Sequence, residues 1–245
     1  MLLECGMGLQ RPDWHVLEEK PPMYTRVYYV LSGDTVYHEA GFSCKLQCGY
    51  LYIFPAHIPY EITTSPTDPL HCLHLHLDLY KVYSPHLISI CLKEDSQLAS
   101  LMDALVAGMK KPRILPYLEC LARALEELCL SRHLFTVRDK HTATLLEAVR
   151  AVYRTSTSLS SVASACGYSE GHFTRVFKKA VGISPHQCII SMRMSDAIRL
   201  LATDASLDQI AEAIGYADGR CFANAFRNYY GVSPSTYRAH YVGRA

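Results

Sequence analysis

Two stretches of this sequence repeat each other and decide the fold of its C-terminal part. Residues 159–185 read LSSVASACGYSEGHFTRVFKKAVGISP, and residues 207–234 read LDQIAEAIGYADGRCFANAFRNYYGVSP. The offset is 48 residues at Gly167 and Gly215 and 49 residues from Phe173 and Phe222 onward, so one residue is inserted in the second turn. Each copy predicts a short helix, a glycine turn and a second helix that ends at Gly-x-Ser-Pro. This is the pattern of a helix-turn-helix unit.

The starts of these helices carry capping signals. Ser206 with Gln209 predicts a capping box, and Ser169 and Asp218 are expected to cap the second helix of each unit. In each second helix two phenylalanines one turn apart are expected to face the core, so the opposite face is left for another molecule.

The outward face of each second helix has the side chains that read DNA. Arg and Asn make paired hydrogen bonds to guanine and adenine edges, Thr and Ala contact the thymine methyl group, and Lys suits phosphate. For any single residue a solvated helix face is the alternative, but the pattern occurs twice in register. The candidate DNA-binding residues are Ser169, Gly171, His172, Thr174, Arg175, Lys178, Lys179, Gly219, Arg220, Ala223, Asn224 and Arg227.

Charge and composition are compatible with this interpretation. The 245 residues are 49% hydrophobic and 19% charged, which excludes a disordered or fibrous chain. Residues 141–245 have 11 Lys and Arg against 7 Asp and Glu, a net charge of +4, whereas residues 1–140 have a net charge of −3. The basic part is the candidate for a polyanion, and the split predicts two domains with different partners.

The tail resembles the DNA-binding domain of AraC/XylS-type transcription regulators. The resemblance covers about Thr142–Tyr241 and includes the closing Gly-x-Ser-Pro motifs and the stretch Arg193–Leu201, which looks like the family's helix joining the two motifs. It implies that both second helices enter successive major grooves on one face of DNA. Gly171, Thr174, Arg175, Gly219, Arg220, Ala223 and Asn224 then fall on base-facing positions. Since glycine offers no base contact, Arg175, Arg220 and Asn224 are expected to carry most of the specificity.

The front of the chain predicts strands. Arg26–Leu31 is β-branched and aromatic, and the Gly33-Asp34 turn signal leads into Thr35–Glu39, which predicts a hairpin. Leu70–Leu79 alternates leucines with His74, His76 and Asp78, so one face belongs to the core and the other faces solvent or a pocket. We expect an antiparallel β-barrel, which resembles the cupin-type sensor domain of such regulators.

Two amphipathic helices are expected between barrel and tail, within residues 94–135. The second has leucines at 118, 121, 125 and 128. This stripe either packs on its own barrel or forms a dimer seam. The expected organisation is an α+β multidomain chain. It comprises a cupin-like effector-sensing barrel at 1–93, a helical dimerisation and linker segment at 94–135, and an all-α domain with two helix-turn-helix motifs at 141–245.

A small polar ligand such as a sugar would suit a barrel interior with aromatic rings and hydrogen-bonding groups. Packed or surface side chains are the alternative for each residue. The candidate ligand-binding residues are Tyr28, His38, Tyr52, His57, Tyr60, His74 and His76.

Two further interpretations remain open. His74, His76 and His57 could hold a catalytic metal, although the His-x-His comes late and Tyr60 stands where a further His is expected. The barrel could also bind a protein or only dimerise. We found no catalytic triad and no phosphate-loop motif, so neither enzymatic activity nor a cofactor is expected.

The sequence thus predicts a DNA-binding transcription regulator controlled by a small-molecule effector. Its expected partners are double-stranded promoter DNA, a second copy of itself and RNA polymerase. With neither a signal peptide nor an apolar span of membrane length, and with ten scattered cysteines expected to stay reduced, it is expected in the cytoplasm.

Overall fold

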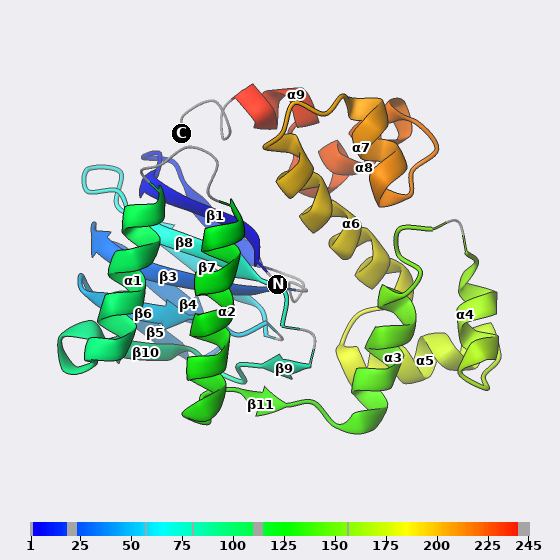
Figure 1. Cartoon of the computed structure of the whole chain (residues 1–245), viewed down its shortest axis with the longest axis horizontal. Coiled ribbons are helices and arrows are strands. Elements are labelled where there is room, and N and C mark those ends of the chain that lie inside the picture. Colours follow the sequence, from blue (N-terminus) through cyan, green and yellow to red (C-terminus); the bar gives the residue numbers. More distant parts are fainter. Residues whose placement is uncertain are drawn as a thin grey trace. The chain divides into compact units, whose positions relative to one another are not determined.

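The computed structural model describes residues 2–18, 24–56, 58–79, 81–109, 115–155 and 157–239. The chain divides into two compact units, Met1–Arg138 and Asp139–Ala245. Figure 1 shows the first as strands covered by two helices and the second as helices alone. No helix in the described ranges has both the length and the apolarity for crossing a membrane.

Two antiparallel sheets form most of the strand region of the first unit, and the chain passes several times from one sheet to the other. The five-stranded sheet has the order β1 (Leu2–Leu9), β8 (His71–Leu77), β3 (Thr25–Ser32), β6 (Tyr50–Ile53) and β10 (Ile88–Cys91). The four-stranded sheet has the order β2 (His15–Glu18), β7 (Tyr60–Thr64), β4 (Thr35–Glu39) and β5 (Phe42–Leu46). A third, short pair joins β9 (Val82–Tyr83) to β11 (Thr136–Val137).

The alternation of side chains along β8 separates two cores. Leu73, Leu75 and Leu77 belong to the core on one face of the five-stranded sheet, and Cys72 belongs to the core between the two sheets. Successive side chains of a strand point to opposite faces, so a single strand serves both cores. His74 and His76 share the face of Cys72 and therefore face the barrel interior.

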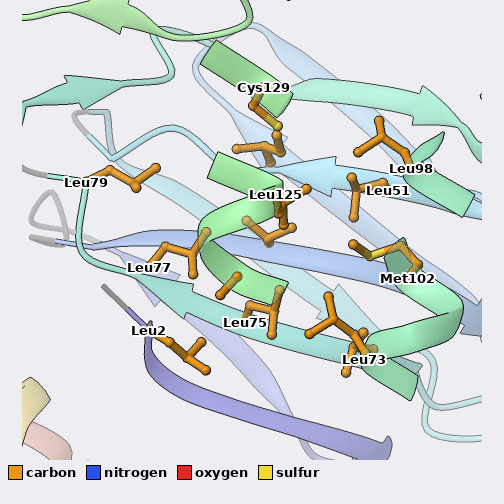
Figure 2. Close-up of a cluster of buried hydrophobic side chains, with 14 of the residues drawn as sticks. Leu2, Leu51, Leu73, Leu75, Leu77, Leu79, Leu98, Met102, Leu125 and Cys129 are labelled. Carbon is orange, nitrogen blue, oxygen red and sulfur yellow. The ribbon is translucent and has the colours of Figure 1, made fainter. Parts of the chain in front are cut away.

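Helices α1 (Ser96–Met109) and α2 (Leu115–Ser131), preceded by the short helix η1 (Leu92–Glu94), cover the outer face of the five-stranded sheet. Leu98 and Met102 of α1 and Leu125 and Cys129 of α2 meet the leucines of β8, as Figure 2 shows. Leu118 is buried in the same core, and Leu121 and Leu128 are packed against it. The leucine stripe of α2 therefore packs on its own barrel.

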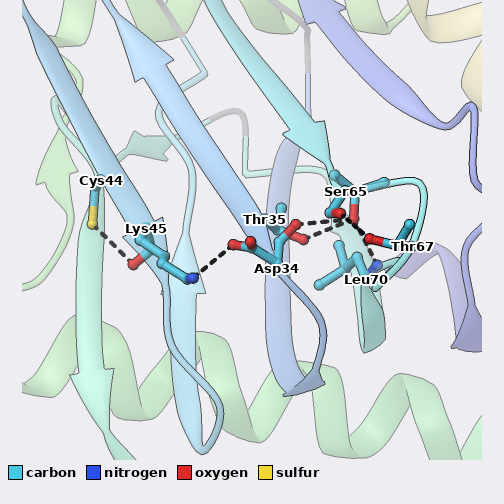
Figure 3. Close-up of polar contacts among 8 residues, drawn as sticks. Asp34, Thr35, Cys44, Lys45, Ser65, Thr67 and Leu70 are labelled. Atoms are coloured by element: carbon cyan, nitrogen blue, oxygen red, sulfur yellow. Dashed lines mark hydrogen bonds and ion pairs between the residues drawn. The ribbon is translucent and has the colours of Figure 1, made fainter.

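The predicted hairpin between residues 26–31 and 35–39 is wrong. β3 pairs with β6 and β8, whereas β4 pairs with β5 and β7 in the other sheet. Gly33, with φ +109, redirects the chain, and Thr35 is tied to Thr64 of β7 by a hydroxyl contact of 3.1 Å (Figure 3). Gly33 and Asp34 do separate two strands, but the pairing partner of each strand is set by long-range contacts.

The second unit consists of α3 (Lys140–Arg150), α4 (Leu159–Ala165), α5 (Glu170–Val181), α6 (Pro185–Leu201), α7 (Leu207–Ile214), α8 (Gly219–Tyr230) and α9 (Pro234–Tyr237). The pairs α4–α5 and α7–α8 are the two predicted helix-turn-helix units, and α6 connects them (Figure 1). The capping box of Ser206 and Gln209 and the caps by Ser169 and Asp218 are confirmed.

Candidate functional site

Helix α5 is held with one face inward and the other toward solvent. Phe173 and Phe177, one turn apart, are fully buried. The Ser169 side chain accepts a hydrogen bond from the amide of His172 at 3.4 Å, and Gly182, with φ +90, ends the helix. These constraints fix both the ends of the helix and its rotation about its own axis.

The outward face of α5 is basic. Gly171, His172, Arg175, Lys178 and Lys179 are exposed, and Thr174 is half-buried. Glu170 is the only acidic residue of the helix and lies in its first turn, where the helix dipole favours a negative charge. Arg175 therefore lies between an acidic first turn and a cationic last turn, whose lysines are suited to phosphate contact beside a base contact by Arg175.

Helix α8 repeats this arrangement with different outward residues. Phe222 and Phe226 are fully buried, and Asp218 accepts a hydrogen bond from the amide of Cys221 at 2.6 Å. Arg220, Asn224 and Arg227 are exposed, and Ala223 is half-buried. The helix itself contains no acidic residue. These side chains lie where the first unit has Gly171, Arg175, Lys178 and Thr174.

The expectation that Gly219 faces DNA bases is wrong. Gly219 is buried, and its amide donates a hydrogen bond of 2.8 Å to Oδ1 of Asp208 on α7. A Cβ atom at this position would come within 2.8 Å of that oxygen and 3.2 Å of the Asp208 backbone nitrogen. The glycine thus permits close packing of α7 against the start of α8. It corresponds to Glu170 of the first unit, because the one-residue insertion precedes it.

Two outward residues were missed by the sequence analysis. Cys221 and Asn228 are exposed on α8 at the positions of His172 and Lys179 on α5. The signal was available, since the 49-residue offset applied throughout both helices pairs them directly. Side-chain type alone does not mark Cys221 or Asn228 as DNA-binding, whereas their register does.

The barrel interior is polar at one end. Glu4 of β1, His76 of β8 and Arg26 of β3 lie in one row across three neighbouring strands. Across the interior, Arg26 forms an ion pair with Glu18 of β2 and donates a hydrogen bond of 2.8 Å to the hydroxyl of Tyr60 on β7. The guanidinium therefore links the two sheets.

The electrostatics of this row follow from burial. Desolvation lowers the pKa of His76 to about 4, although the neighbouring Glu4 carboxylate opposes the shift. His76 is thus neutral at pH 7, and its Nδ1 atom donates a hydrogen bond of 2.8 Å to Glu4. The pKa of Glu4 lies well below its usual value even though burial opposes this, because both histidines favour the carboxylate. Burial lowers the pKa of Arg26, but the nearby Tyr24, Tyr60 and Glu18 outweigh it, so the pKa lies well above its ordinary value.

The next row contains the predicted pocket residues. His74 and Tyr28 are paired neighbours on β8 and β3, and Tyr52 follows on β6. Gly6 lies opposite His74 on β1, where a Cβ atom would come within 2.4 Å of the imidazole. The Nδ1 atom of His74 is buried and has no hydrogen-bond partner among the residues that the structure describes.

Most of the predicted ligand-binding residues therefore share the interior, but His38 does not. Tyr37 of β4 is fully buried between the sheets, so His38, the next residue, points to the outer face, where it contacts Ser43 at 2.9 Å. The prediction that His38 lines the interior is wrong, because successive side chains of a strand point to opposite faces. His57 lies outside the described residues.

Aromatic rings occupy the middle of the interior. Phe54 lies 4.9 Å from Tyr28, 5.6 Å from Tyr37 and 5.8 Å from Tyr60, measured between ring centroids. Glu4, Glu18, Tyr24 and Arg26 were missed as interior residues, because they come together from separate strands and no local spacing links them. Among the described side chains no group of three or more His, Cys, Asp or Glu residues is arranged to hold a metal ion.

Comparison with known proteins agrees with the geometry of the tail. Residues 162–240 match a family model described as a helix-turn-helix domain. An uncharacterised HTH-type transcriptional regulator of Haemophilus influenzae is 29% identical over 171 residues, which are 67% of this chain and 55% of that protein. The multiple antibiotic resistance protein MarA of Salmonella typhimurium is 35% identical over 82 residues, 33% of this chain and 65% of MarA. The chain thus spans less than two thirds of either relative.

The complete fold is similar to that of ToxT from Vibrio cholerae. The structure of ToxT with an unsaturated fatty acid bound matches with a TM-score of 0.67 at 12% identity, over 99% of this chain and 96% of ToxT. At this identity the likeness concerns the fold alone. The tail of our chain is a double helix-turn-helix domain. More narrowly, it is similar to the helix-turn-helix domains of bacterial proteins, and the Haemophilus influenzae relative is named a transcriptional regulator.

Replacing Gly219 of α8 and Gly171 of α5 by alanine should change the stability of the tail in opposite directions. Gly219→Ala should destabilise the tail, because the new Cβ overlaps Asp208 and overpacking costs about 1–3 kcal/mol. Gly171→Ala is the control: only Arg175 Nη1 lies nearby, at 3.9 Å, and alanine favours a helix by about 1 kcal/mol. Thermal unfolding of both variants measures the difference. Equal stability would show that α7 and α8 are not in close contact.

The stability of the barrel should fall as the solution becomes acidic. The pKa of His76 is about 4 in the folded protein against an ordinary value of 6.5, so the unfolded chain binds more protons between these values. Its contribution is complete above pH 6.5 and is lost toward pH 4, with a slope of at most about 1.4 kcal/mol per pH unit. Urea unfolding from pH 4 to 7.5 should show a shallower slope for His76→Gln than for the wild type. His38→Gln, on the outer face, should keep the wild-type slope; parallel slopes for all three proteins would contradict the assignment.

Proposed function

We propose that this chain is a sequence-specific DNA-binding transcription regulator. The observation that carries the proposal is the pair of equivalent helices, α5 and α8, each held by two buried phenylalanines and each presenting Arg or Asn side chains at matching outward positions. A solvated helix surface needs no such repetition. The Haemophilus influenzae relative, which is named a transcriptional regulator, supports the same function.

In this mechanism α5 and α8 enter successive segments of the major groove. Arg175 and Arg220 are suited to paired hydrogen bonds with guanine, and Asn224 to adenine. Lys178 and Arg227, nearer the helix ends, would bind phosphates and set the register of the protein on the duplex. The centres of the two segments should be about 34 Å apart, one turn of DNA.

The barrel is proposed to bind a small polar effector such as a sugar. Buried polar groups are normally hydrogen-bonded, so the unpartnered Nδ1 atom of His74 is suited to accept a hydrogen bond from a ligand hydroxyl. Arg26 and Tyr60 provide further hydrogen-bonding groups on the same interior surface. A regulator of a raffinose operon in Pediococcus pentosaceus is 32% identical to this chain over 87 residues, which supports sugar as the first class to test.

A barrel that only dimerises or binds a protein is the second candidate. The close packing of Phe54 with Tyr28, Tyr37 and Tyr60 favours it, because these rings fill interior space that a ligand would need. In either case we propose a homodimer that acts in the cytoplasm on promoter DNA and contacts RNA polymerase. Since the leucine stripe of α2 is buried on the barrel, a dimer contact through α2 would use its outward residues, among them the exposed Tyr117.

Selection from random duplex DNA by the full-length chain, at fixed salt, should enrich two sequence blocks about one helical turn apart. Arg175→Ala should lose about 1–3 kcal/mol of discrimination for each base contact in one block only. Lys178→Ala should weaken binding to all duplexes alike, because a phosphate contact carries no sequence information. Retention without enrichment, or an equal loss on specific and random DNA for Arg175→Ala, would contradict the assignment.

A ligand screen by thermal unfolding should separate the two barrel functions. A ligand at a hundred times its Kd stabilises the folded state by about 2.7 kcal/mol, which raises Tm measurably. We expect a shift with a sugar that is reduced in His74→Ala and retained in His38→Ala. A shift with a long-chain fatty acid alone would contradict a polar ligand. Dependence of Tm on protein concentration without any ligand effect would favour a dimerising barrel.

A further inference from the structure

The second helix-turn-helix unit meets the segment that leads into the first one, at a point beside α6. This segment, residues 151–155, follows α3 and precedes α4. The second unit contributes the turn at Gly215 and Tyr216, between α7 and α8. Arg193, in the middle of α6, lies between them.

The guanidinium of Arg193 contacts both the segment 151–155 and the turn between α7 and α8. Its Nε atom donates a hydrogen bond of 2.5 Å to the carbonyl of Tyr153, and Nη2 donates one of 3.0 Å to the carbonyl of Thr155. Its central carbon lies 5.1 Å from the centre of the Tyr216 ring. One planar side chain therefore binds two carbonyls of the segment 151–155 and lies over an aromatic ring of the second helix-turn-helix unit.

Backbone approaches backbone at the same point. A Cβ atom on Gly215 would lie 2.9 Å from the carbonyl carbon and oxygen of Arg154 and 2.9 Å from Nη2 of Arg193. Gly167 is the equivalent glycine in the first unit, and a Cβ atom there would meet nothing within 4 Å. The turn of the second unit thus lies against the segment 151–155, and among the described residues the turn of the first unit has no such contact.

A buried carboxylate holds the segment in place. Asp196, only 1% exposed, accepts hydrogen bonds from the Tyr153 hydroxyl at 2.7 Å and from Arg154 Nε at 2.8 Å. Asp196 lies three residues after Arg193 on α6, on a neighbouring part of the helix surface. The segment 151–155 is therefore bound to α6 through its side chains and through its carbonyls.

We propose that Arg193 is a positioning residue that sets the distance between the two DNA blocks the protein reads. This inference rests on the proposed function. Because Arg193 holds the turn of α7–α8 against the segment that leads into α4–α5, it favours one relative placement of α5 and α8. The 17 residues of α6 span about 25 Å along its axis, so a small change of angle at this junction is amplified at the far ends of the two units.

The readout is the spacing of the blocks in DNA selected by the full-length chain. The wild type should select one spacing. Arg193→Ala should select the same two block sequences at several spacings. Its affinity for a two-block duplex should fall on the order of tenfold, because a looser connection lowers the effective concentration of the second unit. Its affinity for a duplex with one block should stay close to the wild-type value.

Arg238→Ala is the matched control. Arg238 also donates to two carbonyls, those of Leu201 at 3.1 Å and Ala205 at 2.6 Å, but these lie at the end of α6 and just before α7, on the side of the second unit. This variant removes a comparable pair of hydrogen bonds without touching the junction. It should weaken recognition of the block read by α8 and leave the spacing unchanged.

Two results would overturn the inference. One is an unchanged spacing in Arg193→Ala, together with an equal loss of affinity for one-block and two-block duplexes. The other concerns the free protein: hydrogen exchange at 151–155 and 215–218 should rise in Arg193→Ala, and unchanged exchange would show that the side chain holds nothing. If the wild type selects no two-block motif, the proposed function fails, and the exchange experiment still decides whether Arg193 joins the units.

Discussion

Burial of two phenylalanines one turn apart is the constraint on which the C-terminal unit depends. Phe173 with Phe177, and Phe222 with Phe226, each fix the rotation of one helix about its own axis. The opposite face is then the only one that can meet another molecule, whatever residues it carries. A helix held only at its ends could rotate and present a different set of side chains. Recognition chemistry can therefore vary on α5 and α8 while the packing stays the same.

The two units are built on one pattern, but they are not equivalent. The inserted residue lengthens the second turn, and Asp208 compensates by accepting a hydrogen bond from Gly219 at the start of α8. The second turn also packs against the segment 151–155, through Gly215 and Arg193. The second helix-turn-helix is thus fixed both internally and to its neighbour. In the first unit, a side chain at Gly167 would meet open space, so its turn has no comparable contact.

Within the barrel the physical cost lies in buried charge. Arg26, Glu18 and Glu4 are largely removed from water, and such groups are tolerated only with good partners. Their network connects the two sheets at one end, while Phe54 and its neighbouring rings occupy the middle. Apolar residues would serve a purely structural interior at least as well. Such a network instead fixes the positions of polar groups on the interior surface, and His74, whose Nδ1 atom has no partner among the described residues, lies beside it.

The sequence by itself determined what depends on local spacing. The repeat with its caps, the burial of Phe173 and Phe222, and the alternation along β8 all follow from periods of 3.6 and 2 residues. Tertiary structure alone decided which strands pair, so β3 and β4 separate into different sheets although a turn joins them. It also buried Gly219, and it placed Arg193 between two units. These outcomes depend on contacts between distant residues, and no local period encodes the distance at which two remote segments meet.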